Sequence, residues 1–448
     1  MKTLTQTDWI KAKFGDVIGK KGFISDGDWV ESKDQDPNGE VRLIQLADIG
    51  EGIFLDKSKR FLTLEKAKEL RCTFLQPGDL LVARMPDPLG RACIFPVIQI
   101  PSVTVVDICI VRPDSNIVDV NWLKHSVNSL LFRSQLKVFI SGATRERISR
   151  KNLEKIPIAI PPLPEQQRIA AILDKANALR EKRWRAIAKL DELLKSVFSE
   201  MFGDPVTNPK GWPTLGIEEV CGLVVDCVNR TAPTVENPTP FKMIRTSNVK
   251  SGQVNLNNVK YVTEDTFQRW NRRAIPRQGD VLLTREAPVG EAGILEGDEL
   301  VFLGQRLMLY RTNTEKMTPE YLLFSFLGDF LQQQFAKEGS GSTVKHLPLP
   351  VCRNLQIRVP PLKNQQAFSS CVSIIKKLKI KNRSSLQKLD YLFLSLQQRA
   401  FSDELSSESE KELEKLIEKL SEESVIEKLL EESSPKQPEQ LSLFSLLE

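Results

Sequence analysis

The sequence PPLPEQQ at residues 161–167 begins a segment that contains no further proline or glycine until Gly203. Adjacent prolines prevent a helix before this point, whereas a proline in the first helical turn costs no hydrogen bond and presets φ. A helix over the roughly 37 residues that follow would be about 55 Å long at 1.5 Å rise per residue. The segment therefore predicts a rod that is too long for an ordinary globular helix.

A second copy of this segment begins with PPLKNQQ at residues 360–366. In both copies apolar residues recur at alternating steps of three and four, which is the spacing of a coiled-coil seam. The seam includes Ile169, Ile172, Leu179 and Leu190 in the first copy and Phe368, Ile375, Leu378 and Leu389 in the second. Polar residues interrupt both seams at the same place, at Arg183 and Asn382, and a single buried polar residue of this kind can set helix register.

Two such helices in one chain are expected to pack on each other. About 160 residues separate them, which is enough for one whole domain, so the second helix returns antiparallel if that domain joins their ends. We therefore predict an α+β protein with two similar mixed α/β domains separated by two long antiparallel coiled-coil helices, with pseudo-two-fold symmetry. The predicted boundaries are 1–160 and 205–359 for the domains, 161–204 and 360–404 for the helices, and 405–448 for a tail.

The two end domains repeat the same order of predicted elements, with clear similarity at turns and little between them. Strands at 41–46 and 241–246, helices at 63–70 and 263–270, and Gly-Asp turns at 78–79 and 279–280 correspond. Single helices are predicted at 121–140 and 319–335, one strand at 103–111, and polar glycine loops at 141–147 and 339–345. A shared scaffold with divergent surfaces is expected if the two domains recognise different targets.

Charge is unevenly distributed along the 448 residues, whose formal net charge is +5. The tail from Glu404 onward contains 13 Glu and 5 Lys, so it carries −8 and the preceding residues carry +13. A basic body of this kind suits a polyanionic partner.

Other compositional features indicate a cytoplasmic protein. The polar start is unlike a signal peptide, and Pro96 and Pro101 interrupt the most apolar window, so no membrane span is expected. The cysteines number seven and form no CxxC pair, which favours reduced, packed thiols. The chain has only two histidines, so a histidine-based metal site or catalytic triad is not expected.

No motif of an enzyme is complete in this sequence. There is no GxxxxGK[ST] phosphate-binding loop. Residues 237–241 read NPTPF, in which the inserted Thr239 breaks the Asn-Pro-Pro-aromatic spacing of amino-methyltransferases. Asp79 and Asp280 each follow a turn glycine and are interpreted as turn caps. We therefore expect a non-catalytic chain.

Taken together, these duplicated motifs resemble the specificity (S) subunits of type I restriction-modification systems. The resemblance covers about residues 1–403 and rests on the Gly-Asp turns, the SGAT loop at 141–144, the PPLPEQQ helix start and their second copies. Members of that family have two target-recognition domains, each followed by a long helix.

The resemblance implies a DNA-address function in phage defence. One S subunit would bind double-stranded DNA and hold two modification subunits, which methylate adenine N6 with S-adenosylmethionine. Two restriction subunits would add translocation and cleavage driven by ATP with Mg²⁺. The chemistry and cofactors would belong to those partners, and each domain would read half of a bipartite target with a fixed spacer.

Eight residues are candidate DNA contacts because they follow or lie in the paired turns, loops and early strands. They are Arg84, Arg145, Arg147, Lys242, Arg245, Asn248, Arg285 and Lys345. A base contact and a phosphate contact are both compatible with these side chains, and so is an ordinary surface charge.

The tail carries a further motif. Helix-spaced leucines between Glu404 and Ser434 allow a short amphipathic helix or marginal order. QLSLF at 440–444 then resembles the short motif that binds the bacterial replicative sliding clamp, with Gln440, Leu441, Leu443 and Phe444 as anchors. Packing of this apolar end on the long helices is the alternative.

Two other functional classes remain open from the sequence. A two-headed scaffold would bind proteins with its end domains, and bipartite DNA selection by the assembled complex would distinguish it from a DNA-address subunit. A self-sufficient modification enzyme would transfer methyl groups without partners.

Overall fold

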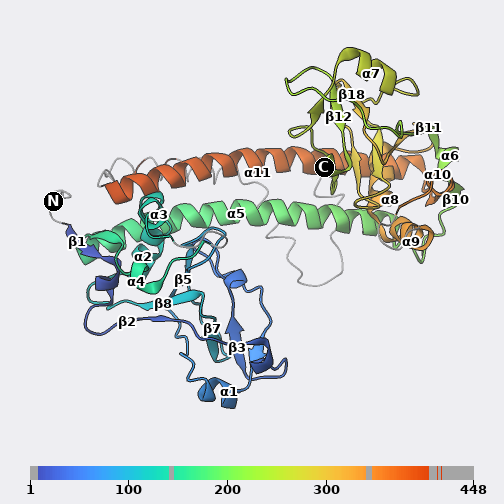
Figure 1. Cartoon of the computed structure of the whole chain (residues 1–448). Helices are drawn as coiled ribbons and strands as arrows, with labels where there is room; N and C mark the ends of the chain where they lie inside the picture. The colour runs from blue at the N-terminus through green and yellow to red at the C-terminus, as the bar shows by residue number, and fades with distance from the viewer. Residues whose placement is uncertain (1–8, 141–145, 340–345, 403–410, 412–414, 416–448) are drawn as a thin grey trace. The chain divides into compact units, whose positions relative to one another are not determined.

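The computed structural model describes residues 9–140, 146–339 and 346–402, together with Lys411 and Lys415. These residues form two compact units, one from 9–185 with 383–402 and the other from 186–382 (Figure 1). Each unit contains one mixed α/β domain and part of each long helix. Each domain has its own hydrophobic core, which extends onto those helices.

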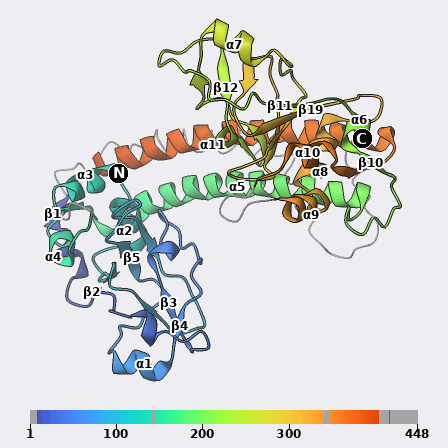
Figure 2. The ribbon, with the colours of Figure 1, turned by 45° about the vertical axis from the view of Figure 1, so that its right-hand side comes forward.

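The predicted rods are α5 (Leu163–Phe202) and α11 (Leu362–Ser402). In the first unit, Ile169 and Ile172 near the start of α5 share a core with Leu396 near the end of α11. In the second unit, Val197 near the end of α5 shares a core with Phe368 near the start of α11. The helices therefore pair antiparallel, as predicted, and they lie side by side within each unit in two views (Figure 2).

The predicted seam is largely buried. Six of its eight residues are buried, and Leu179 and Leu378 are half-buried. Arg183 and Asn382, the polar interruptions, are also buried, at 9% and 4% exposure. Ion pairs beside the seam join the helices within each unit, Arg180 with Asp390 at 2.7 Å and Lys379 with Asp191 at 2.5 Å.

The first domain contains two small sheets and a strand pair. The four-stranded antiparallel sheet has the order β2 (Phe23–Asp26), β8 (Ile108–Arg112), β5 (Leu80–Ala83), β6 (Ala92–Ile94). The three-stranded sheet has the order β4 (Phe61–Leu62), β3 (Val41–Ile44), β7 (Ser102–Thr104), with β3 and β7 parallel. β1 (Ile10–Lys13) pairs with β9 (Pro157–Ile160), which leads into α5. Helix α1 (Leu64–Glu69) begins where the Thr63 hydroxyl caps it.

The second domain repeats this plan. Its large sheet has the order β11 (Cys221–Asp226), β19 (Leu307–Thr312), β16 (Val281–Thr284), β17 (Ala292–Ile294), β14 (Gly252–Val254), β13 (Val249–Lys250). The small sheet is β15 (Lys260–Tyr261), β12 (Lys242–Ile244), β18 (Val301–Leu303), and β10 (Thr214–Gly216) pairs with β20 (Gln356–Arg358). The β13–β14 hairpin has no counterpart among the described strands of the first domain. The short helix α7 (Glu264–Trp270) corresponds to α1 of the first domain.

Three predicted elements are each split in two. The helix predicted at 121–140 is α2 (Val120–Val127) and α3 (Leu130–Lys137), because the Ser129 hydroxyl accepts the Phe132 N–H and starts a new helix. The helix predicted at 319–335 is α8 (Pro319–Leu327) and α9 (Asp329–Glu338), which Gly328 separates. The strand predicted at 103–111 is β7 and β8, which a turn at 105–107 separates.

The paired aspartates cap turns, as predicted, and also bind arginines. Asp79 accepts the Gln76 N–H at 2.7 Å and two bonds from Arg112, at 2.6 and 2.8 Å. In the second domain, Asp280 accepts the Arg277 N–H at 2.8 Å and two bonds from Arg311, both at 2.8 Å. A bidentate pair of this kind compensates for burial of the carboxylate, which is 1% exposed in each domain. The sequence did not indicate the arginine partners.

Within the described part of the chain, no helix combines the length and apolar character needed to cross a membrane. All seven cysteines are free and buried. No group of three or more His, Cys, Asp or Glu side chains among the described residues could hold a metal ion.

Candidate nucleic-acid interface

A cleft of about 550 Å³ opens on the first domain. It lies between the segment after β2, the turn after β3, and the β7–β8 turn that contains Asp107. Its lining includes Trp29, Gln35, Gln45, Arg60 and Asp107. The Trp29 ring is 68% exposed, and the Arg60 guanidinium donates to Gln35 Oε1 at 3.3 Å. The cleft therefore combines an exposed aromatic ring with amide, guanidinium and carboxylate groups.

These side chains have the chemistry that reads base edges. Arginine binds guanine, glutamine binds adenine, a carboxylate accepts from the cytosine amino group, and aromatic rings stack on bases. Asp28 also lines the cleft and accepts the Thr73 N–H at 2.9 Å. Burial raises the pKa of Asp28, and this hydrogen bond offsets part of the effect.

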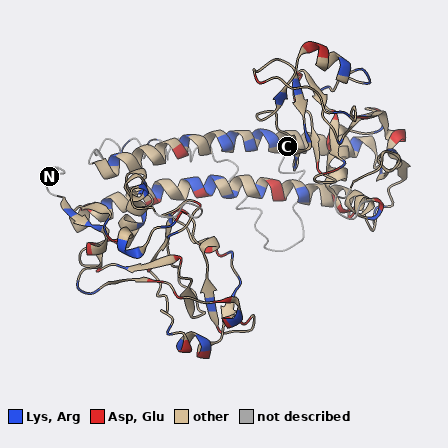
Figure 3. Cartoon of the chain, viewed as in Figure 1, with Lys and Arg blue, Asp and Glu red and all other residues tan. Residues whose placement is uncertain are grey.

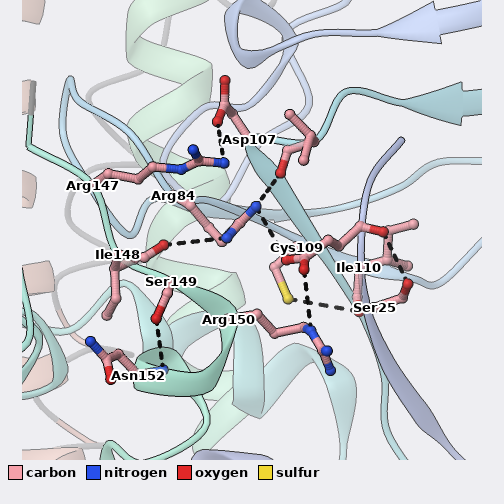
Figure 4. A network of polar contacts seen from close by, with 12 residues as sticks. Ser25, Arg84, Asp107, Cys109, Ile110, Arg147, Ile148, Ser149, Arg150 and Asn152 are labelled. Atoms are coloured by element: carbon pink, nitrogen blue, oxygen red, sulfur yellow. Dashed lines mark hydrogen bonds and ion pairs between the residues drawn. The ribbon is translucent and has the colours of Figure 1, made fainter. Parts of the chain in front are cut away.

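Arg147 reaches the edge of this cleft through an ion pair with Asp107 at 2.9 Å (Figure 4). The side chains are 43% and 27% exposed, respectively, so the pair faces solvent. The backbone of Asp107 is also fixed, because its carbonyl accepts the Arg84 N–H at 2.9 Å. Arg147 is thus one predicted DNA-contact residue that the structure places at the surface.

Arg84, by contrast, is an interior residue. It is 4% exposed, and its guanidinium pairs with Asp26 at 3.1 Å and donates to the Val106 and Ile148 carbonyls (Figure 4). The prediction that Arg84 contacts DNA is therefore corrected to a structural role. Arg84 fixes the segment that follows the 141–147 loop against the end of β5.

The second domain has the opposite arrangement of charges at the equivalent position. The Arg306 carbonyl accepts the Arg285 N–H at 2.8 Å, as the Asp107 carbonyl does from Arg84, so Arg306 occupies the place of Asp107. Arg306 pairs with Glu286 at 2.8 Å and its side chain is 53% exposed. Its φ of 72° is uncommon for a residue other than glycine, and such positions cluster at functional sites.

The remaining candidates in the second domain have different environments. Asn248 is 4% exposed and binds the Asn255 and Asn258 carbonyls at 3.0 and 2.8 Å, so its predicted DNA contact is also corrected to a structural role. Arg245 is half-buried beside it and donates to the Asn258 carbonyl at 3.4 Å. Lys242 pairs with Glu299 at 3.4 Å, and half-buried Arg285 donates to the Leu347 carbonyl at 2.8 Å.

Some candidates are not located. Arg145, Lys345 and the motif residues Gln440, Leu441, Leu443 and Phe444 lie outside the described residues. Conversely, sequence reasoning missed Trp29, Gln45, Arg60 and Arg306. Only folding brings the first three together, and Arg306 directly precedes β19, a strand that was not predicted from the sequence.

Lysine and arginine also gather on the long helices (Figure 3). Lys376, Lys377, Lys379 and Lys381 lie in one run on α11, and Arg180, Lys182, Arg183 and Arg185 lie in another on α5. Several of these have acidic partners, such as Glu296, which pairs with Lys376 at 2.8 Å.

Comparison with known proteins defines the class. The family model described as "Type I restriction modification DNA specificity domain" matches residues 6–187 and again 209–374, so the chain belongs to this family. It is a specificity subunit of the type I restriction-modification kind, a non-catalytic DNA-recognition chain.

Particular relatives agree with this assignment. The chain is 24% identical over 302 residues to the type I restriction enzyme MjaVIII specificity subunit of Methanocaldococcus jannaschii, covering 63% of this chain and 70% of the relative. It is 24% identical over 328 residues to the EcoKI specificity subunit of Escherichia coli, covering 67% and 68%.

Solved structures share the fold. The type I restriction-modification S subunit from M. genitalium aligns with a TM-score of 0.51 at 12% identity, covering 90% of this chain and 98% of that one. A chain from a study of complex assembly and conformational transition of the type I R-M system aligns with a TM-score of 0.52 at 18% identity, covering 90% and 100%. The predicted fold class is thereby confirmed.

Proposed function

We propose that this cytoplasmic chain determines which DNA sequence a type I restriction-modification complex binds, with each domain recognising one half of a bipartite target. The observation that carries the proposal is the duplicated domain with opposite charges at one equivalent position, Asp107 in the first domain and Arg306 in the second. The first domain presents Asp107 with Arg147, and the second presents Arg306 with Glu286. Because the two domains share a fold but carry oppositely charged side chains at this position, we expect them to recognise two different half-sites.

The cleft supplies the base-reading groups of the first domain. Arg60 and Gln45 offer hydrogen bonds to purine edges in the major groove, and Trp29 offers an exposed ring. In the second domain, half-buried Arg245 follows β12 as Gln45 follows β3, and Arg306 lies at the place of Asp107. The lysine and arginine runs on α5 and α11 would bind spacer phosphates or partner subunits.

The long helices set the spacer in this proposal. Their continuity over 40 and 41 residues supports a rigid connection between the half-site readers. Two modification subunits and two restriction subunits would assemble on the chain. S-adenosylmethionine, ATP and Mg²⁺ would be bound by those partners, which would also extrude the target adenine.

One substitution in each domain tests whether each domain recognises one half-site. In the complex assembled with its modification subunits, Arg306→Ala should relax sequence preference in one half-site and Arg60→Ala in the other. Each change should cost about 1–3 kcal/mol against the preferred base, because a bidentate contact is lost. Competition binding with targets randomised in one half at a time measures this. If binding weakens equally for all sequences, both residues contact phosphates and not bases. If binding does not change, neither residue lies at the DNA interface.

A second binding function is favoured by the QLSLF motif after Pro438. We propose that these residues bind the replicative sliding clamp. Purified clamp should retain the full chain and lose it when Leu443→Ala and Phe444→Ala are combined. Leu446→Ala with Leu447→Ala is the matched control outside the motif and should leave binding intact. Equal retention of both double variants would refute clamp binding through the motif.

A further inference from the structure

An apolar groove lies in the first unit beside the end of α11. Its volume is about 240 Å³, and Trp9, Leu131, Phe132 and Phe401 line it. The rim continues into exposed apolar side chains at the two ends of α3, where Leu130 is 64% exposed and Val138, which follows the helix, is 81% exposed. Lys11 also lines the groove, and exposed Lys137 and Lys155 lie on the bordering segments. The groove thus has an apolar floor and a basic rim.

One polar atom in this groove is unsatisfied. Gln135 lines the groove, and its Oε1 is buried without a hydrogen-bond partner among the described residues. In the second domain, Gln334 occupies the equivalent place, and its Oε1 accepts the Gln356 N–H at 2.9 Å. The residue that corresponds to Gln356 is Pro157, which has no N–H. Because buried acceptors are almost always paired, a donor is expected from whatever fills the groove.

The second unit shows how the equivalent surface is covered. There the chain turns back immediately after α5, and the Pro205 carbonyl accepts from Arg358 Nε at 3.3 Å. Pro205 also lies 4.0 Å from the point that a Cβ on Gly328 would occupy. Lys210 Nζ donates to the Glu200 carbonyl at 2.7 Å, which holds the returning segment on the helix end. The residues that follow a long helix therefore close the surface of that unit.

The same position in the first unit follows α11. Phe202 near the start of the returning segment and Phe401 are equivalent residues of the repeat, and both are buried, at 3% and 7% exposure. The chain continues beyond Ser402 for 46 residues, which are acidic and include helix-spaced leucine and isoleucine. Their charge is opposite to that of the lysine rim, and their apolar residues match the floor.

We infer that the tail segment from Asp403 to Ser434, which precedes the QLSLF motif, docks into this groove of its own chain. Its leucines would cover Trp9, Leu131 and Phe401, its glutamates would face Lys11 and Lys137, and one of its donors would pair with Gln135. The first unit would then be closed by the segment that follows its long helix, as the second unit is.

Thiol cross-linking in the full chain tests this inference. Leu130→Cys with Glu404→Cys places one thiol on the rim and one at the start of the tail. The matched pair in the second unit is Asp329→Cys with Pro205→Cys, and a distant control pairs Val97→Cys, an 84% exposed position, with Glu404→Cys. All seven native cysteines are buried, so a short bis-maleimide should react at the introduced thiols.

The first pair should cross-link within single molecules at a rate close to that of the matched pair. It should exceed the distant control by about tenfold, because docking raises the local concentration of the thiol. Combining it with Lys11→Glu and Lys137→Glu should slow the reaction several-fold. Cross-linking no faster than the distant control, or only between two molecules in proportion to concentration, would overturn the inference.

Discussion

Gln166 and Gln365 make the same three hydrogen bonds in their two units. Gln166 Oε1 accepts the Asp119 N–H at 2.8 Å, and its Nε2 donates to the Ile117 and Pro161 carbonyls at 2.9 and 2.8 Å. Gln365 repeats this with the Thr318 N–H at 3.0 Å and the Lys316 and Pro360 carbonyls at 3.1 and 2.8 Å. Each buried amide thereby joins the start of a long helix to the start of a domain helix.

Removing either amide should destabilise its unit. Gln166→Ala or Gln365→Ala leaves one buried N–H and two buried carbonyls unpaired, so we expect a loss of about 3 kcal/mol in the free energy of unfolding. Gln167→Ala and Gln366→Ala are matched controls, because both neighbours are exposed. Urea unfolding measures the difference, and equal losses in variants and controls would contradict the role of the buried amides.

His125 predicts a dependence of stability on pH. Burial lowers its pKa, although its 2.7 Å hydrogen bond to Asp174 opposes this. For Asp174, burial alone would raise the pKa, but hydrogen bonds from His125 and Lys124 outweigh it and hold the pKa at about 2. Below pH 6.5 the unfolded chain therefore takes up a proton that folded His125 resists, and stability is lost as the pH falls.

The variant His125→Gln should remove this part of the pH dependence. The slope of unfolding free energy between pH 6.5 and 5.5 should decrease by up to about 1.4 kcal/mol per pH unit, which is the value for one proton. Urea unfolding of both proteins at several pH values provides the comparison. Identical slopes would show that His125 is protonated equally in the folded and unfolded chains.

The sequence allowed only part of the site to be predicted at this scale. PPLPEQQ indicated a helix start, but two of the three partners of Gln166 lie 47 and 49 residues away and are fixed by tertiary structure. Arg84 was selected because it follows a turn and a strand, and burial was not visible in that pattern. Trp29, Gln45 and Arg60 lie on separate segments, so no spacing in the sequence could link them.

At the scale of elements, the long helices were predictable because a seam repeated over many turns is a strong signal. Shorter elements were predicted less well. The breaks at Ser129 and Gly328 depend on local capping and on packing against the sheet, which a general helical pattern does not contain. The aromatic cluster around Phe368 was also not predicted as such, because Phe198 and Phe324 are distant in sequence.

Phe368 should be the most sensitive seam position in the second unit. It is fully buried, and its ring lies 5.3 Å from Phe198, 5.6 Å from Phe202 and 5.0 Å from Phe324. Phe368→Ala should cost about 3–5 kcal/mol, because it leaves a cavity among aromatic rings. Tyr391→Ala, on an exposed face of α11, should cost little. A similar loss for both in thermal or urea unfolding would mean that the seam is not the main packing surface.

At the scale of the whole molecule, duplication with divergence is the central feature. Apart from the β13–β14 hairpin, the same order of described strands and helices occurs twice, together with equivalent buried aspartates and glutamines. The exposed pairs differ, with Asp107 and Arg147 in one domain and Arg306 and Glu286 in the other. Under the proposed function, the two half-sites should therefore have different sequences.

The most direct test is a genome-wide map of N6-methyladenine in the host with the native gene, without the gene, and with both long helices lengthened by seven residues. Seven residues preserve the seam and add about 10 Å, the length of about three base pairs. We predict a two-part motif with a fixed gap that disappears on deletion and whose gap widens by about three base pairs with the longer helices. A contiguous motif, or a gap that does not change in a strain that still methylates, would contradict the account.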